Sequence, residues 1–534
     1  DTESIVQQLV KTKSTKVTNL KNEQKKLEWK QTAWQDLNSK IYNLYSKTLS
    51  NLRLSSAYSK KSTVCTDSTK ATIVASEGAV NGTQTLKVNK LAKSGYLTGA
   101  KLDGKTTTTT GADGKDVTKT VDWAVTDKLS EIDSNLTGKT ITLTTGSGTD
   151  AKATDIEITA DMTINDLVAK FKDAGVNASF DTTNQRFFIN STGTGSAKNF
   201  TLTSDDSTAL ASLGLDPNAT YTDINGSKNS CVKIEGQDAE IVLNGATFVS
   251  DSNTFSINGL TINTLGVTDE EISVVTSTDY DGIYNTIKDF LTEYNDLINE
   301  MDKLYNADSA RKYDMLTDDE KESMTDDEVE QWEDKIKSAL LRKDNSLYTV
   351  MNTLTSTMME GFYENNLSDK EKKNMTSSEI AAWYKENGGK KHYLSDYGIG
   401  TLSYFEAQDN EHHAYHINGD ADDEFTSTKE DKLKAAIAED PEGTANFFAT
   451  LCKTLYSKLD ETMSESTDYS SIYKVYNDKQ LKKDYSDYTT KISDAESELN
   501  DYEDRWYDKF SKMEVALSKL QSQTSSISSM LGSN

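Results

Sequence analysis

The feature that most constrains this chain is a heptad pattern of apolar residues near each end. In the N-terminal stretch the pattern recurs every seven residues, as in a coiled coil, at Leu20, Leu27, Trp34 and Ile41. In the C-terminal stretch, apolar residues recur at alternating spacings of three and four up to Leu531. Ordinary helices average about 12 residues, and both stripes are several times longer. The pattern therefore favours pairing of the two terminal helices, with or without partner chains, over packing of each helix on its own domain.

Polar residues interrupt the N-terminal stripe. Gln24, Gln31 and Asn38 occupy its second seam position, where polar side chains lower stability while fixing the register, and we expect them to keep the pairing reversible. The C-terminal stripe contains an eleven-residue step from Tyr502 to Met513, which locally unwinds a left-handed supercoil. We predict that an assembly seam is formed by Val17, Leu20, Gln24, Leu27, Gln31, Trp34, Asn38, Ile41, Leu499, Tyr502, Trp506, Phe510, Met513, Leu517, Leu520, Ile527 and Leu531.

Between about residues 62 and 275 the apolar period changes from helical to alternating, which is typical of strands. Glycine and asparagine turns separate the alternating segments, and residues 161–174 form one short predicted helix. The run of threonines at 106–110 is expected to be an exposed loop or hairpin tip. From residue 277 the helical period returns, and a helix over 429–464 is expected to be interrupted at Pro441.

The chain, with 534 residues, is too long for one hydrophobic core, so several domains are expected. We predict an α+β multidomain fold in which the terminal helices pair as a coiled coil or bundle and β-rich domains are inserted between them. The expected segments are an N-terminal helix (1–60), an inner β domain in two parts (61–97 and 225–275), an outer β domain with one short helix (98–224), a helical domain (276–475) and a C-terminal coiled-coil helix (476–534).

Two acidic stretches in the helical domain, 316–332 and 367–383, repeat one another. Each contains two capping boxes and ends in a tryptophan, Trp332 or Trp383, which we expect to anchor a pair of short helices. Two copies are too few for a solenoid, which needs at least three. The predicted capping pairs are Thr317 with Glu320, Thr325 with Glu328, Ser368 with Glu371 and Thr376 with Glu379.

Charge excludes two classes of function. The chain has 58 basic and 86 acidic side chains, a net charge of −28. Nucleic-acid binding requires cationic groups on phosphates, and anionic membrane surfaces attract the same groups, so neither is expected. No stretch has the length of a membrane span, and no cleavable secretory signal is recognised at the start of the sequence. The three cysteines, Cys65, Cys231 and Cys452, have no metal-binding or disulfide-framework spacing.

The polar residues form no recognisable metal or catalytic motif. His412, His413 and His416 lie close to acidic residues, but they lack the spacing of a zinc helix, so a polar loop is favoured over a metal site. Asp420 and the acids after it lack the glycine that a calcium loop needs at its sixth position, where Phe425 stands, so we expect solvated acids. No nucleophile elbow or phosphate loop occurs. The sequence predicts no catalytic, metal or cofactor site and no enzymatic activity.

Several segments, in order along nearly the whole chain, resemble the flagellar filament cap family, also called hook-associated protein 2. These segments are 1–9 (DTESIVQQL), 27–38 (LEWKQTAWQDLN), 82–92 (GTQTLKVNKLA), 239–245 (AEIVLNG), 287–298 (IKDFLTEYNDLI), 397–400 (YGIG) and 505–513 (RWYDKFSKM). The acidic tryptophan-bearing repeats are absent from some better-known members.

The resemblance implies a secreted structural protein. Such proteins leave the cell through the flagellar export channel without a cleavable signal and sit outside it, at the distal tip of the filament. They form a ring-shaped homo-oligomer whose β domains, the head, make a plate that retains flagellin. Their helical legs engage the filament end, where flagellin folds and inserts. Further partners implied are the hook-associated junction proteins and an export chaperone at the C-terminal helix.

Two alternatives remain from the sequence. Another axial flagellar protein, such as flagellin or a different hook-associated protein, would also pair its terminal helices. A bacterial surface adhesin would use the β domains to bind a host-surface ligand, either glycan or protein, and adhesion could coexist with capping.

Overall fold

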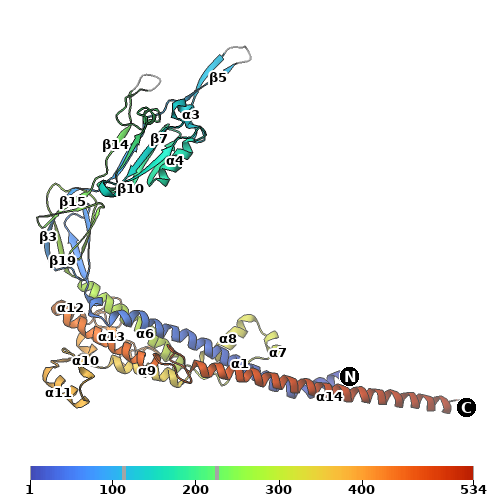
Figure 1. The fold of residues 1–534 in the computed structure, drawn as a ribbon. Helices are drawn as coiled ribbons and strands as arrows, with labels where there is room; N and C mark the ends of the chain where they lie inside the picture. The colour runs from blue at the N-terminus through green and yellow to red at the C-terminus, as the bar shows by residue number, and fades with distance from the viewer. Residues whose placement is uncertain (1, 111–115, 223–227, 368, 533–534) are drawn as a thin grey trace. The chain divides into compact units, whose positions relative to one another are not determined.

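In the computed structural model, the chain forms two compact units (Figure 1). The first unit combines Asp1–Ser59 with Tyr280–Asn534, and the second is Lys60–Asp279. The structure describes residues 2–110, 116–222, 228–367 and 369–532. The first unit is mainly helical and contains both terminal helices, while the second is β-rich and inserted between them in sequence. The predicted α+β fold with paired terminal helices is confirmed; the finer division into domains stays a prediction.

The first unit is built mainly from helices. Its α-helices are α1 (Thr2–Asn43), α2 (Ser50–Leu52), α6 (Tyr280–Tyr305), α7 (Asp318–Glu322), α8 (Asp326–Ser338), α9 (Asn345–Met358), α10 (Asp369–Lys372), α11 (Ser377–Asn387), α12 (Lys432–Glu439), α13 (Pro441–Met463) and α14 (Asp478–Leu531). Between them lie the π-helix η1 (Leu44–Leu49), the 3₁₀ helices η2 (Ser55–Tyr58) and η6 (Leu394–Tyr397), and the short strands β20 (Phe362–Tyr363), β21 (Lys391–His392), β22 (Ile399–Gly400) and β23 (His416–Ile417).

Local sequence explains where several of these helices begin. Pro441 separates α12 from α13, as predicted, and stands at the first position of α13, where its missing N–H is not needed. The carboxylate of Asp440 caps α13 by accepting a hydrogen bond from the Gly443 N–H at 2.9 Å. Three predicted capping boxes are present, at Thr317, Thr325 and Thr376. The fourth, at Ser368, lies outside the described residues.

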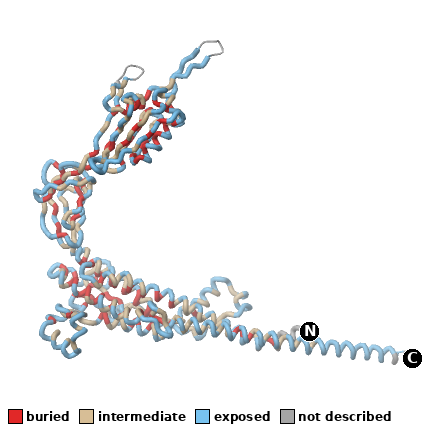
Figure 2. The backbone as a smooth tube through the Cα atoms, viewed as in Figure 1, coloured by how far each residue is buried: buried red, intermediate tan, exposed pale blue. Residues whose placement is uncertain are grey.

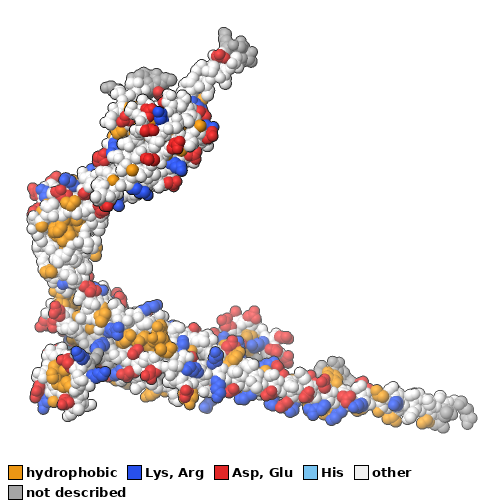
Figure 3. Space-filling model, viewed as in Figure 1, with side chains coloured by type: hydrophobic (Ala, Val, Ile, Leu, Met, Phe, Trp, Pro, Cys, Tyr) orange, Lys and Arg blue, Asp and Glu red, His pale blue; other side chains and the backbone are white. Residues whose placement is uncertain are grey.

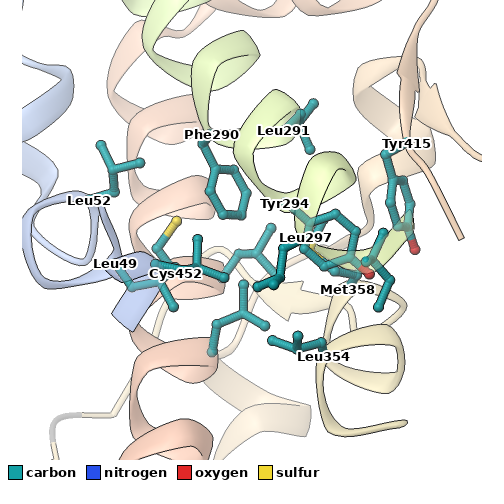
Figure 4. Close-up of a cluster of buried hydrophobic side chains, with 14 of the residues drawn as sticks. Leu49, Leu52, Phe290, Leu291, Tyr294, Leu297, Leu354, Met358, Tyr415 and Cys452 are labelled. Atoms are coloured by element: carbon teal, nitrogen blue, oxygen red, sulfur yellow. The ribbon is translucent and has the colours of Figure 1, made fainter. Parts of the chain in front are cut away.

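The core of the first unit lies where α6, α9, α13 and the end of the N-terminal helix meet. Figure 4 shows Phe290, Tyr294 and Leu297 of α6 pointing towards Leu354 of α9 and Cys452 of α13. Leu49 of η1 and Leu52 of α2 close the same cluster. Burial of this many large apolar side chains, each contributing about 1.5–3 kcal/mol, holds the two ends of the chain in one unit.

The second unit is built from antiparallel strands with three short α-helices. Its strands are β1 (Lys61–Cys65), β2 (Ala71–Ala75), β3 (Gly82–Lys90), β4 (Ser94–Thr98), β5 (Lys105–Thr110), β6 (Asp116–Val121), β7 (Thr140–Thr145), β8 (Lys152–Glu157), β9 (Val176–Asp181), β10 (Arg186–Thr194), β11 (Phe200–Ser204), β12 (Tyr221–Thr222), β13 (Lys228–Asn229), β14 (Val232–Ile234), β15 (Ala239–Leu243), β16 (Ala246–Ser250), β17 (Thr254–Ile257), β18 (Leu260–Thr264) and β19 (Ile272–Thr278). Its helices are α3 (Leu129–Ile132), α4 (Ile164–Asp173), α5 (Ala209–Ser212) and the 3₁₀ turns η3 (Ser134–Leu136), η4 (Gly148–Asp150) and η5 (Ser196–Lys198).

The strands form separate sheets around two hydrophobic clusters. One cluster lies on a five-stranded sheet of order β1-β19-β3-β15-β16 and a three-stranded sheet of order β17-β18-β2. The other, between residues 97 and 231, lies on sheets of order β14-β4-β10-β9 and β11-β7-β8, with α4 packed on β9. Ile164, Leu167, Val168 and Phe171 of α4 are all buried there, on the face that the sequence predicts.

The threonine run, expected to be an exposed loop or hairpin tip, is exposed and lies in a hairpin, where it forms part of a strand. Thr106–Thr110 lies within β5, which pairs with β6 in an isolated two-stranded hairpin whose side chains are largely exposed. The residues that join these two strands lie outside the described part. In the described part of the chain, no helix has both the length and the apolar character required to cross a membrane.

Candidate assembly interface

The two terminal helices, α1 and α14, lie side by side and antiparallel (Figure 1). Residues later in α1 contact residues earlier in α14. Lys16 Nζ lies 3.0 Å from Glu498 Oε2, and further along α1 the Gln24 amide donates to Thr489 Oγ1 at 2.7 Å. The apolar stripes of the two ends of the sequence thus face each other over part of their length.

One face of α1 is buried at the end nearest the bundle. Trp34 is 1% exposed and its ring stacks on Tyr476, just before α14, with ring centres 5.1 Å apart. Ile41 is buried on the same face of α1. Leu37, which the predicted seam omits, is equally buried, and its position three residues after Trp34 is the sequence signal that would have found it. This part of the seam belongs to the core of the bundle.

The side chain of Asn38 bonds to the loop before α14. Its side chain is 3% exposed, and its amide nitrogen donates to the Tyr473 carbonyl at 3.1 Å. Its amide oxygen accepts from the Val475 N–H at 3.0 Å. Tyr473 has a φ of +64°, an uncommon conformation for a residue with a side chain, and the bonds beside it hold this turn in place. Asn38 therefore orders the loop before α14, and the expectation that it keeps the pairing reversible stays a prediction.

Gln24 and Gln31 behave differently from Asn38. Gln24 is half-buried and bonds directly to α14, donating to Thr489 Oγ1 and to the Tyr485 carbonyl at 3.3 Å. Gln31 is also half-buried. A polar pair of this kind across two helices fixes their register.

In the stretch where α1 pairs with α14 outside the bundle, the seam is only partly buried. Val17 is buried on α1, and Ile492 and Ala495 are buried on α14, although the predicted seam omits the last two. The larger seam residues are half-buried: Leu20, Leu27, Leu499, Tyr502, Trp506 and Phe510. Two helices alone do not enclose side chains of this size.

Beyond Phe510 the stripe is exposed, as the pale end of α14 in Figure 2 shows. Met513 is 43% exposed and Leu520 is 58% exposed. Leu517 and Ile527 are exposed too, and hydrophobic side chains appear at the surface along this end (Figure 3). The structure does not bring these four residues together with α1. The side chain of Leu531, the last residue of α14, lies outside the described part.

Some of the polar residues that raised the question of a metal site form ion pairs. His416 Nδ1 lies 2.6 Å from Asp423 Oδ2, and both side chains are largely buried. Lys288 Nζ lies 2.8 Å from Asp420 Oδ1 and 2.6 Å from Asp422 Oδ2, so the expectation of solvated acids is wrong for Asp420 and Asp423. Burial alone would raise the pKa of Asp423, but hydrogen bonds from His416 and from the Phe425 N–H hold it below its usual value.

The other two histidines lie apart from this cluster. His412 stacks on Tyr404 with ring centres 4.8 Å apart, and His413 is exposed. Among the residues that the structure describes, no group of three or more His, Cys, Asp or Glu side chains could hold a metal ion.

The two acidic repeats are arranged as capped helices. Trp332 Nε1 donates to the Asp314 carbonyl at 2.8 Å, and its ring meets Tyr313 edge-on. Lys337 at the end of α8 lies over the ring of Trp29 of α1, 5.1 Å from its centre. Acidic side chains gather on the surface over α7 and α8 (Figure 3). The first repeat thus packs beside the half-buried part of the seam.

Two family models match the sequence. The model described as "Flagellar hook-associated protein 2 C-terminus" matches residues 236–522, and the one described as "Flagellar hook-associated protein 2 N-terminus" matches residues 1–95. The chain belongs to the flagellar hook-associated protein 2 family. This is a family of structural flagellar proteins and not a known enzyme family.

Individual members of the hook-associated protein 2 family are distant relatives. The protein from Halalkalibacterium halodurans is 24% identical, over 99% of this chain and 97% of that protein. The one from Thermotoga maritima is 27% identical, over 71% of this chain and 53% of that protein. Among solved structures, the D1, D2 and D3 domains of the flagellar cap protein FliD from Escherichia coli are 20% identical with a TM-score of 0.49, covering 82% of this chain and 97% of that chain.

Proposed function

We propose that this protein caps the distal end of the bacterial flagellar filament. In this function several copies form a ring whose β-rich units make a plate, and the helical units act as legs that engage the filament end. The plate retains exported flagellin and promotes its folding and insertion. The protein acts outside the cell, after export by the flagellar apparatus.

The observation that carries this proposal is the partly open seam of α1 and α14. A helix whose apolar stripe is half-buried for one stretch and exposed for the next buries further surface when other helices pack on it. The partners proposed for this surface are other copies of the chain, flagellin, the hook-associated junction proteins and an export chaperone at α14. Family membership supports the choice of these partners, and the open seam is the surface proposed for binding them.

A deletion strain tests the proposal. Without this protein the cells are expected to keep their hooks, to grow no filaments and to release unpolymerised flagellin into the medium, and the full-length protein supplied in trans should restore filaments. Flagellin in the medium is measured by immunoblot after removal of cells. Normal filaments combined with loss of attachment to host surfaces would contradict capping and favour the adhesin.

A further inference from the structure

A cavity of about 680 Å³ lies in the helical unit, apart from the paired terminal helices. Its walls come from β20 and β21, from η6, from the end of α12 and from the start of α13. It is therefore formed by the segment that contains the second acidic repeat, where that segment packs on the bundle. No part of the proposed capping function uses this cavity.

One wall of the cavity is aromatic. Tyr397 and Phe447 are almost fully buried, with ring centres 4.6 Å apart. Phe362 of β20 extends this wall, its ring centre lying 5.8 Å from that of Phe447. The faces of aromatic rings carry negative charge density and attract cations.

The rest of the lining is strongly acidic. Five carboxylates line the cavity, against one lysine, Lys390, and one histidine, His392; the carboxylates are Glu364, Asp396, Glu439, Asp440 and Glu442. Burial raises the pKa of the Tyr397 hydroxyl, and the charges of Asp396, Asp440 and Glu364 raise it further. The potential inside the cavity is therefore negative.

The carboxylates are held on different walls rather than gathered around one point. Glu364 lies 3.0 Å from His392 Nε2 and accepts from the Lys390 N–H at 3.1 Å. Asp396 accepts from the Tyr393 N–H at 3.0 Å, and Asp440 caps α13. A small metal ion needs several oxygens at about 2.0–2.6 Å, which this arrangement does not offer. A larger cation with spread-out charge fits both the aromatic wall and the dispersed carboxylates.

We propose that this cavity binds an organic cation, a guanidinium or alkylammonium group, against the Phe362–Tyr397–Phe447 wall. Such a group is carried by an arginine or lysine side chain of a neighbouring protein, or by a free polyamine. Glu439 and Glu442, both exposed, face the cavity without a structural hydrogen bond among those that the structure describes, so they are free to pair with the incoming charge.

Titration of the full-length chain tests the proposal. The probes are N-acetylarginine amide and its uncharged analogue N-acetylcitrulline amide, with binding followed by calorimetry at low salt. The arginine probe is expected to bind saturably and more weakly as salt rises, because charge pairing is screened, while the citrulline probe does not bind. The double variant Glu439→Gln/Glu442→Gln is expected to bind the arginine probe about fivefold more weakly, because two partly exposed charge pairs with the probe are lost.

The matched control is Glu461→Gln, an exposed position on the same helix α13 but away from the cavity, which should bind like the wild type. Equal binding of the two probes, or unchanged binding by the double variant, would overturn the proposal. Spermidine and an arginine-containing peptide then distinguish the sources. Tighter binding of spermidine than of the peptide supports a free polyamine, and the reverse supports a side chain of a neighbouring protein.

Discussion

At the scale of single residues, Asn38 sets the geometry where the C-terminal helix begins. Its amide bonds to both Tyr473 and Val475, more than 430 positions away in the sequence, and so fixes the turn that leads into α14. A polar residue in a heptad seam is usually interpreted through its effect on helix pairing. Here the partner is a loop, and the amide satisfies backbone groups that would otherwise be buried without hydrogen bonds.

Replacement of Asn38 measures how much its hydrogen bonds contribute to stability. Asn38→Ala leaves the Tyr473 carbonyl and the Val475 N–H unpaired, so it should lower the free energy of unfolding by about 1–3 kcal/mol, even though alanine favours the helix. Urea titration followed by tryptophan fluorescence measures the change. Gln31→Ala, at a half-buried position of the same stripe, is the control and should change the value by no more than about 0.5 kcal/mol. Equal effects of the two variants would show that the loop contacts contribute little.

The Asp423–His416 pair predicts that the free energy of unfolding depends on pH. The pKa of Asp423 is lowered in the folded protein, so its charged form stabilises the fold above the unfolded value of about 3.9, and this contribution is lost as the pH falls through the lower folded value. The difference in unfolding free energy between the wild type and Asp423→Asn should therefore be largest near neutral pH and shrink below about pH 4. Denaturant titrations at several pH values measure it, and a difference that grows on acidification would contradict the assignment.

At the scale of elements, α14 differs along its length. Its first half shares a seam with α1, whereas the stretch after Phe510 presents the same apolar stripe to solvent. Because exposed apolar side chains contribute little to the stability of the isolated chain, we propose that these residues serve contacts with other molecules.

Serine substitutions on this stretch separate folding from assembly. The triple variant Leu517→Ser/Leu520→Ser/Ile527→Ser should change the free energy of unfolding by no more than about 0.5 kcal/mol, since all three side chains are exposed. A strain carrying it should nevertheless lose filaments and release flagellin, as measured by electron microscopy and immunoblot. The control is Lys519→Ser/Gln523→Ser on the same helix, which should leave filament growth unchanged. Normal filaments in the triple variant would show that the stripe is not used in assembly.

The sequence predicted elements better than it predicted their pairing. Helix α4 and its buried face follow from its period, and the caps at Thr317 and Thr325 follow from local spacing, because each depends on residues three or four apart. The partner of Asn38 and the point at which α14 leaves α1 could not be predicted. Both depend on the register between segments at opposite ends of the chain, which a heptad pattern leaves undetermined.

At the scale of the whole molecule, the β-rich unit is an insertion between two halves of the helical one. Its first strand, β1, pairs antiparallel with its last, β19, so that Lys61 lies opposite Thr278. The Asp279 N–H donates to the Lys60 carbonyl at 3.0 Å and closes this pairing at its end. The chain therefore enters and leaves the unit through neighbouring strands, which is the arrangement that tolerates insertion of one domain into another.

This arrangement predicts that residues 60–279 fold on their own. Among the described residues, the hydrophobic clusters of the β-rich unit are made of its own side chains, and the β1–β19 pairing holds the new ends together. The isolated fragment should be soluble, give dispersed amide signals in a two-dimensional NMR spectrum and unfold cooperatively on heating. A fragment that lacks β1, residues 67–279, is the control: it leaves β19 without its outer neighbour and should be markedly less stable. If the fragment 60–279 is unfolded alone while the full chain is stable, the β-rich unit depends on contacts outside its own cores.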